Sequence, residues 1–159
     1  MKKNLKNRLG FTLIELLVVI SIIGVLTAII VPNMMGMRER ARDSKRKSAL
    51  KELKTALRLY YNDHQAYPPS TTDDSIDCGG TACAWGSPFE VNGVVYMKEL
   101  PHDDTNQYHY QRYNSGEAFR AWVELENSAD QEIESSQTKC QISPSDTYYS
   151  ELGYYVCSD

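Results

Sequence analysis

The sequence predicts an α+β fold in which one long N-terminal helix precedes a smaller head of antiparallel strands. Three observations predict it: an apolar block over 11–31, strong helix formers over 37–61, and short alternating segments between turn signals after residue 68. A chain of 159 residues has room for one modest domain and an anchor. We expect four parts: a basic leader (1–10), a membrane-spanning helix (11–31), its continuation (32–67) and a globular head (68–159).

Charge is distributed unevenly along the chain, although the formal net charge is only −4. The first ten residues hold four basic side chains, and residues 38–58 hold nine basic and three acidic ones. Residues 60–159 hold four basic side chains against seventeen acidic ones. An acidic head repels a phosphate backbone, so the composition argues against nucleic acid as a partner.

The apolar block 11–31 contains no basic residue and one acid, Glu15. As a helix it would span about 31 Å, which matches the hydrocarbon core of a bilayer. A cleaved secretory signal has a shorter apolar region and a small-residue cleavage site, of which Leu26-Thr27-Ala28 is only a weak version. We therefore predict a membrane helix. A carboxylate at the centre of such a helix costs ~2.5–3.5 kcal/mol, so Glu15 is a candidate functional residue, with snorkelling to the headgroups as the alternative.

The segment KNRLGFTLIE, residues 6–15, resembles the class III signal of type IV prepilins and type II secretion pseudopilins. The resemblance implies a pilin-like fold, in which the long helix packs on a small antiparallel sheet. It also implies that prepilin peptidase cuts between Gly10 and Phe11 on the cytoplasmic side and then methylates the new N-terminus. Gly24 and Pro32 match positions at which the helices of this family are interrupted.

The resemblance further implies where the chain resides and what it binds. The subunit would cross the inner (cytoplasmic) membrane once with its N-terminus inside, contacting lipid and an assembly platform. It would then join identical subunits in a helical homopolymer, either an extracellular pilus or a periplasmic pseudopilus. In that polymer Glu15 would meet the Phe11 amine of a neighbour, because pairing two charges at low dielectric recovers much of their desolvation. Glu15 is thus expected to set the register of assembly.

Beyond the membrane the helix is predicted to continue over 32–67, with Pro32 kinking or loosening it. Residues 41–48 offer only small side chains among charges and have little to bury within their own subunit. They are expected either to form a solvated face or to pack against neighbouring subunits. One apolar stripe should lie on the head: Leu50, Leu53, Leu57 and Tyr60.

All four cysteines lie in the head, and an even number in an exported domain predicts disulfides with three connectivities. We favour the short-range pairs Cys78–Cys83 and Cys140–Cys157. The second pair would close a C-terminal loop, as in many pilins. A zinc site is the alternative, but the spacings C-x₄-C and C-x₁₆-C without a matching histidine fit it poorly.

The head is predicted to begin with a loop, since residues 68–90 are rich in Pro, Gly, Ser, Thr and Asp. Asn92-Gly93 is a turn signal. Residues 119–125 alternate as a strand, and residues 108–113 should pair with it across the turn at 114–117. Residues 148–157 supply a final strand or clasp. Trp122 falls on the polar side of its strand, so it is either covered by that clasp or a contact residue.

The sequence predicts neither catalytic residues nor a cofactor. Its three histidines are scattered, and no Ser or Cys nucleophile stands in a recognised setting. LPHDDTN resembles the LPxDP stretch of secretion pseudopilins, some of which bind calcium nearby. Asp103, Asp104 and Asn106 offer suitable oxygen ligands, but Asp104 replaces the proline of that stretch. Turn and capping roles are therefore the stronger interpretation.

Three functions are consistent with these observations. The favoured one is a major type IV pilin, the subunit of a surface filament used for attachment, motility or DNA uptake. It is favoured because the stapled, cysteine-containing head looks suited to an exposed fibre and lacks the full calcium-type motif. The alternative is a type II secretion pseudopilin of a short periplasmic filament, and a remote one is a membrane-anchored enzyme.

Overall fold

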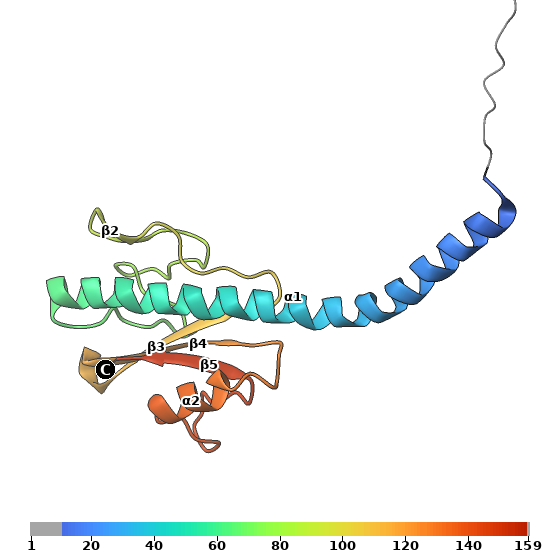
Figure 1. Cartoon of the computed structure of the whole chain (residues 1–159). Helices are drawn as coiled ribbons and strands as arrows, with labels where there is room; N and C mark the ends of the chain where they lie inside the picture. The colour runs from blue at the N-terminus through green and yellow to red at the C-terminus, as the bar shows by residue number, and fades with distance from the viewer. Residues whose placement is uncertain (1–10, 159) are drawn as a thin grey trace, which may run out of the picture. The chain divides into compact units, whose positions relative to one another are not determined.

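Figure 1 shows the computed structural model of the chain, which describes residues 11–158. The predicted α+β fold is confirmed: a 52-residue helix, α1 (Leu13–His64), precedes a head of antiparallel strands. The chain divides into two compact units, one ending at Arg38 and one beginning at Glu39, and α1 supplies residues to both. The leader 1–10, with the expected cleavage residue Gly10, lies outside the described residues.

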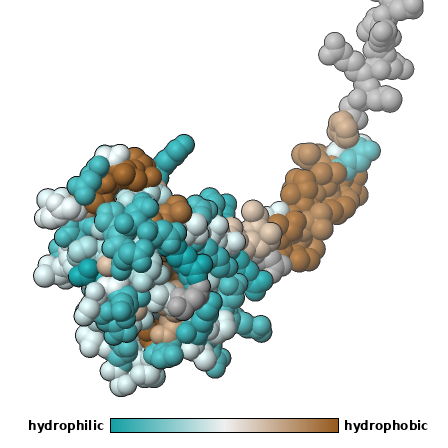
Figure 2. Space-filling model, turned by 90° about the vertical axis from the view of Figure 1, so that its left-hand side faces the viewer, coloured by the Kyte–Doolittle hydropathy of each residue, from teal (hydrophilic) through white to brown (hydrophobic). Residues whose placement is uncertain are grey.

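In the first unit the apolar side chains of α1 are exposed. Every residue from Leu13 to Val31 is exposed, and Figure 2 shows this segment as a band of apolar surface. Within the described residues, α1 is the one helix long and apolar enough to cross a membrane. The helix continues through Gly24 and Pro32, so the expected interruptions do not end it. Either residue weakens a helix, but the apolar residues on both sides are compatible with helix.

The second unit buries one stripe of α1 against the head, as predicted. Leu50, Leu53 and Leu57 are fully buried, and Tyr60 is 8% exposed. Their partners in the hydrophobic core include Phe89, Tyr110, Phe119, Val123 and Val156. The stripe begins earlier than predicted, at Asp43 and Arg46, each only 1% exposed. The spacing of three and four residues therefore extends two turns further towards the N-terminus.

The main sheet has three antiparallel strands in the order β3 (Tyr108–Tyr113), β4 (Ala118–Glu124) and β5 (Gly153–Cys157). The predicted hairpin between residues 108–113 and 119–125 is confirmed, and the short 3-10 helix η1 (Asn114–Gly116) forms its turn.

A separate hairpin joins β1 (Phe89–Val91) to β2 (Val94–Met97). It turns at Asn92 and Gly93, whose φ angles of 52° and 81° are those of a type I′ turn. The turn predicted from this Asn-Gly pair is confirmed.

The end of α1 and the presence of a second helix differ from the prediction. α1 ends at His64 instead of residue 67, because Gln65 adopts a left-handed backbone with φ of 56°. A second helix, α2 (Glu132–Lys139), was not predicted. It buries only Ile133 and Ser136, and its two Ser residues and its Thr have weak helix propensity. Packing against β5 therefore has to stabilise it.

Trp122 is covered by the C-terminal part of the chain. It is 6% exposed, and its ring stacks between those of His109 and Tyr155, with Tyr148 at its edge. The clasp alternative for this tryptophan is therefore the right one.

Candidate functional site

The first candidate site is the N-terminal end of α1, where Thr12 and Glu15 form a capping box. The Glu15 carboxylate accepts hydrogen bonds from the Thr12 amide at 2.8 Å and from its hydroxyl at 2.7 Å. In return the Thr12 hydroxyl accepts from the Glu15 amide at 3.3 Å. Such reciprocal bonds satisfy amide donors at the start of a helix.

This capping role was missed at the level of the sequence, although Thr12-Leu-Ile-Glu15 fits the pattern for it. Within a single subunit the carboxylate is therefore occupied by its own helix end. Phe11, the expected first residue of the mature chain, is 93% exposed. The arrangement holds the Glu15 carboxylate at the helix end, close in sequence to the amine that processing would create.

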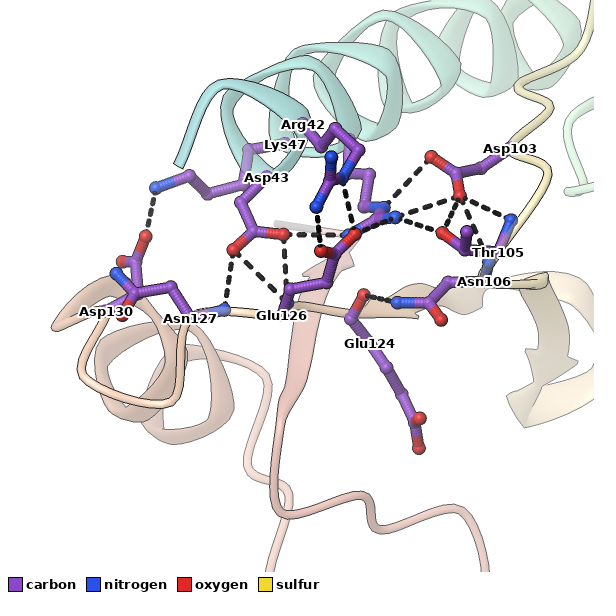
Figure 3. A network of polar contacts seen from close by, with 11 residues as sticks. Arg42, Asp43, Lys47, Asp103, Thr105, Asn106, Glu124, Glu126, Asn127 and Asp130 are labelled. Carbon is purple, nitrogen blue, oxygen red and sulfur yellow. Dashed lines mark hydrogen bonds and ion pairs between the residues drawn. The ribbon is translucent and has the colours of Figure 1, made fainter. Parts of the chain in front are cut away.

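The second site is a buried ionic cluster centred on the Arg46 guanidinium, which joins α1 to two loops of the head. Arg46 forms ion pairs with Asp43 at 2.9 Å, with Asp103 at 2.9 Å and with Glu126 at 2.7 Å. The Thr105 hydroxyl accepts a further hydrogen bond at 2.6 Å. Figure 3 shows how these side chains converge from α1, from the loop before β3 and from the segment after β4.

Asp43, three residues before Arg46 on α1, completes the cluster. Its carboxylate accepts hydrogen bonds from the backbone amides of Glu126 and Asn127, at 2.8–3.2 Å. Each buried charge thus has both an ionic partner and hydrogen bonds, which burial of a charge requires. The cluster fixes α1 to the segment that follows β4.

The charges of this cluster stabilise one another. Hydrogen bonds from Arg42 and Arg46 lower the pKa of Glu126 to about 2. The hydrogen bond from Arg46 also holds the pKa of Asp103 well below its usual range. Burial alone would lower the pKa of Arg46, but its bonds to Asp103 and Glu126 outweigh this and raise it. All three groups therefore stay charged at neutral pH.

Two further basic residues of α1 bind the head around this cluster. Arg42 forms a bidentate pair with Glu126, and the Lys47 ammonium lies 2.8 Å from both Asp130 and Glu132. The prediction that residues 41–48 have little to bury within their own subunit is therefore wrong. The helical spacing of the buried stripe leads from Leu50 back to Arg46 and Asp43. This spacing could have predicted that both residues are buried within their own subunit.

The residues considered for calcium have other partners or are exposed in this structure. The Asp103 Oδ1 atom already accepts from four donors: the Arg46 guanidinium, the Thr105 amide and hydroxyl, and the Asn106 amide. The Asp104 side chain is 97% exposed, and the Asn106 side chain donates to the Glu124 carbonyl. Among the described residues no cluster of three His, Cys, Asp or Glu could hold a metal ion. Asp103 therefore acts as a cap and an ion-pair partner.

Both favoured disulfides are present. Cys78–Cys83 closes the loop before β1, and Cys140–Cys157 joins the end of α2 to the last residue of β5. Because Cys157 is also paired with Arg120 of β4 in the sheet, the second disulfide ties α2 to the sheet edge.

Comparison with known proteins gives two kinds of match. The family model described as the prokaryotic N-terminal methylation motif matches residues 5–31. The chain is 35% identical to the type II secretion system core protein G of Vibrio cholerae over 109 residues, 68% of this chain and 73% of that protein. It is 37% identical to the core protein G of Aeromonas hydrophila over 99 residues, 62% of this chain and 68% of that protein.

A type IV pilin matches over a shorter length. The chain is 44% identical to the type IV major pilin protein PilA of Myxococcus xanthus over 64 residues, 40% of this chain and 29% of that protein. No solved structure gives a significant match.

Proposed function

Because the chain belongs to the family of type IV prepilins and type II secretion pseudopilins, we propose that it is a secretion pseudopilin. Its subunits would polymerise into a short periplasmic filament. The length of the matches supports this choice. A match of 109 residues is longer than the leader and α1 together, so it includes part of the head. The 64-residue pilin match needs no head residue. The alternative of the sequence analysis is therefore better supported than the favoured major pilin.

The N-terminal residues have the roles that this function requires. Prepilin peptidase would cut after Gly10, and the exposed segment 13–31 would hold the subunit in the inner membrane until it enters the filament. Glu15 would then pair with the Phe11 amine of a neighbouring subunit. We propose a structural role without catalysis, because the most deeply buried charges, Asp43 and Arg46, are engaged in contacts that fasten α1 to the head.

Deletion of the gene in its own organism tests the proposal. The deletion should abolish export of secreted enzymes into the medium and leave surface pili in place. The wild-type gene should restore export, whereas Gly10→Val should not, because the uncut precursor stays in the membrane. Loss of surface pili with normal export would instead establish the pilin function, and normal pili with normal export would reject both.

A further inference from the structure

β5 is an edge strand whose own sequence does not protect it from pairing with a further strand. In the described part of the chain, the strand order β3-β4-β5 leaves one side of β5 without a neighbouring strand. Such an edge can pair with another chain unless charges, proline or a bulge prevent it. The residues of β5, Gly-Tyr-Tyr-Val-Cys, include no charge and no proline, and their described register with β4 contains no bulge. The protection of this edge therefore has to come from elsewhere in the chain.

The backbone groups of alternate residues in β5 face away from β4. The Ser158 amide, directly after the strand, donates to the Phe119 carbonyl of β4, so Ser158 faces β4. In an antiparallel ladder this direction alternates along the strand. The backbone groups of Gly153, Tyr155 and Cys157 therefore face the free edge, and a further strand would bond to them.

The helix α2 lies along this edge and bonds the outward-facing groups (Figure 1). The Tyr155 amide donates to the Ser136 hydroxyl at 3.1 Å, and the Gln137 side-chain amide donates to the Gly153 carbonyl at 3.2 Å. The third outward-facing residue, Cys157, is joined by its disulfide to the residue that follows α2. The side chains of α2 thus supply the acceptor and the donor that a neighbouring strand would otherwise provide.

The buried residues of α2 also indicate that this contact is its main attachment. Among its eight residues it buries Ile133 and Ser136, and the Ser136 hydroxyl is the group that bonds β5. Burial of a hydroxyl is unfavourable unless it is hydrogen-bonded, so the bond to the Tyr155 amide accounts for a serine at this position.

The opposite edge of the sheet is covered by a different segment. Residues 70–77 lie beside β3, where the Asp74 carbonyl accepts from the Tyr110 amide at 2.6 Å. β3 also carries a charge of its own, Arg112. Both edges of the sheet are therefore covered, and the uncharged edge is the one that depends on the side chains of a helix.

We propose that α2 guards the edge of β5 against the β5 strand of a second copy of this chain. Two identical strands can pair antiparallel about a two-fold axis at Tyr155, because each offers the donors and acceptors that the other strand needs. Such a pair is isologous and closes as a dimer, whereas a filament needs an open helical arrangement. The inference rests on the proposed filament function and adds that α2 keeps crowded subunits out of a competing dimer.

Full-length subunits, placed one per lipid nanodisc, test the guard, because the discs separate the membrane helices and leave the heads free to meet. The guard variant, Ser136→Ala with Gln137→Ala, removes both side-chain bonds to the edge and keeps the disulfide. Each such bond shifts an equilibrium about fivefold, so the association constant of the discs should rise at least about 25-fold over wild type. Mass photometry counts the single and paired discs.

Two further sets of variants serve as controls. Ser135→Ala with Thr138→Ala is the matched control, since it changes two exposed residues of α2 whose side chains have no described bond to β5. Adding Cys140→Ser and Cys157→Ser to the guard variant should release α2 and increase pairing further. Cys157→Pro in place of Cys157→Ser should abolish the increase, because proline removes an outward-facing N–H and leaves the ladder with β4 intact.

Several results would overturn the inference. Single discs of a guard variant with a native near-ultraviolet circular dichroism spectrum would show that β5 needs no guard, and loss of that spectrum would make α2 a support of the fold instead. Equal pairing of the matched control would exclude the two bonds as the cause. Pairing that Cys157→Pro leaves unchanged would place the contact outside β5. The proposed function is tested separately, because normal secretion after gene deletion rejects it whatever the discs show.

Discussion

Replacing Arg46 by methionine should cost the head most of its margin of stability. The Arg46 side chain is 1% exposed and balances three carboxylates, of which Asp43 is equally buried. Removing one partner of a buried ion pair costs about 3–5 kcal/mol, because the other charge stays buried without compensation. Asp43 keeps its two backbone amide donors, so we expect the lower end, about 3 kcal/mol.

Thermal unfolding of the detergent-solubilised full chain, followed by near-ultraviolet circular dichroism, measures this cost. For a unit of this size about 1 kcal/mol corresponds to roughly 3–5 °C, so Arg46→Met should lower Tm by about 10–15 °C. Arg42→Met is the matched control, since its side chain is 45% exposed and contacts the same Glu126. An exposed pair contributes less than about 1 kcal/mol, so the control should lose less than about 4 °C.

The same cluster predicts the pH dependence of stability. The pKa of Glu126 is about 2 in the folded chain and that of Asp103 is also lowered, so both carboxyls are more acidic than when unfolded. Their contribution is fully present above about pH 5 and disappears as the pH falls towards about 2. The difference in Tm between wild type and Arg46→Met should therefore shrink over this range.

Two outcomes would refute this reasoning about the cluster. One is an Arg46→Met variant that melts within about 3 °C of the wild type. The other is an Arg42→Met variant that loses as much stability as Arg46→Met. A partial recovery is expected when Asp43→Leu is added to Arg46→Met, because the uncompensated carboxylate is then gone.

Three further predictions concern other parts of the chain. Glu15→Gln, which keeps a capping box and loses the charge, should be processed and stable in the membrane but form few filaments. The control variant Thr12→Val, which keeps the charge, should still form filaments. Normal filaments of Glu15→Gln in electron micrographs would show that the charge is dispensable. Cys140→Ser should cost ~2–4 kcal/mol and expose residues 141–158 to protease, and unchanged digestion would contradict this. Calcium and a chelator should give Tm values within about 1 °C of each other, because Asp103 is occupied by Arg46.

Much of the fold follows from local patterns that tertiary contacts reinforce. The stripe from Leu50 to Tyr60, the Asn92-Gly93 turn and the β3–β4 hairpin were all predicted, because periodicity and turn chemistry act over a few residues. α2 was not predicted, since its helical state depends on Ile133 and Ser136 packing against β5. That contact joins residues that are distant in the sequence.

The ionic cluster shows why charged residues are harder to place. Arg46 and Asp43 follow the helical spacing of the buried stripe. Because a charged side chain is normally exposed, neither residue was predicted to belong to that stripe. Their burial depends on Asp103 and Glu126, which lie 57 and 80 or more residues away in the chain. Glu15 gives the opposite case, because its partner Thr12 lies three residues away and a local pattern suffices.

The Cys140–Cys157 disulfide also determines how far the head can be extended under mechanical load. A subunit pulled through its N-terminal helix transmits tension to the strands that α1 packs against. If the head began to unfold, the chain between these two cysteines, which are 17 residues apart, could not extend while the disulfide is intact. At about 3.5 Å per residue, the disulfide withholds roughly 60 Å of contour length from the stretched molecule. β5 and α2 are therefore expected to yield together, as one mechanical element, when the chain is pulled.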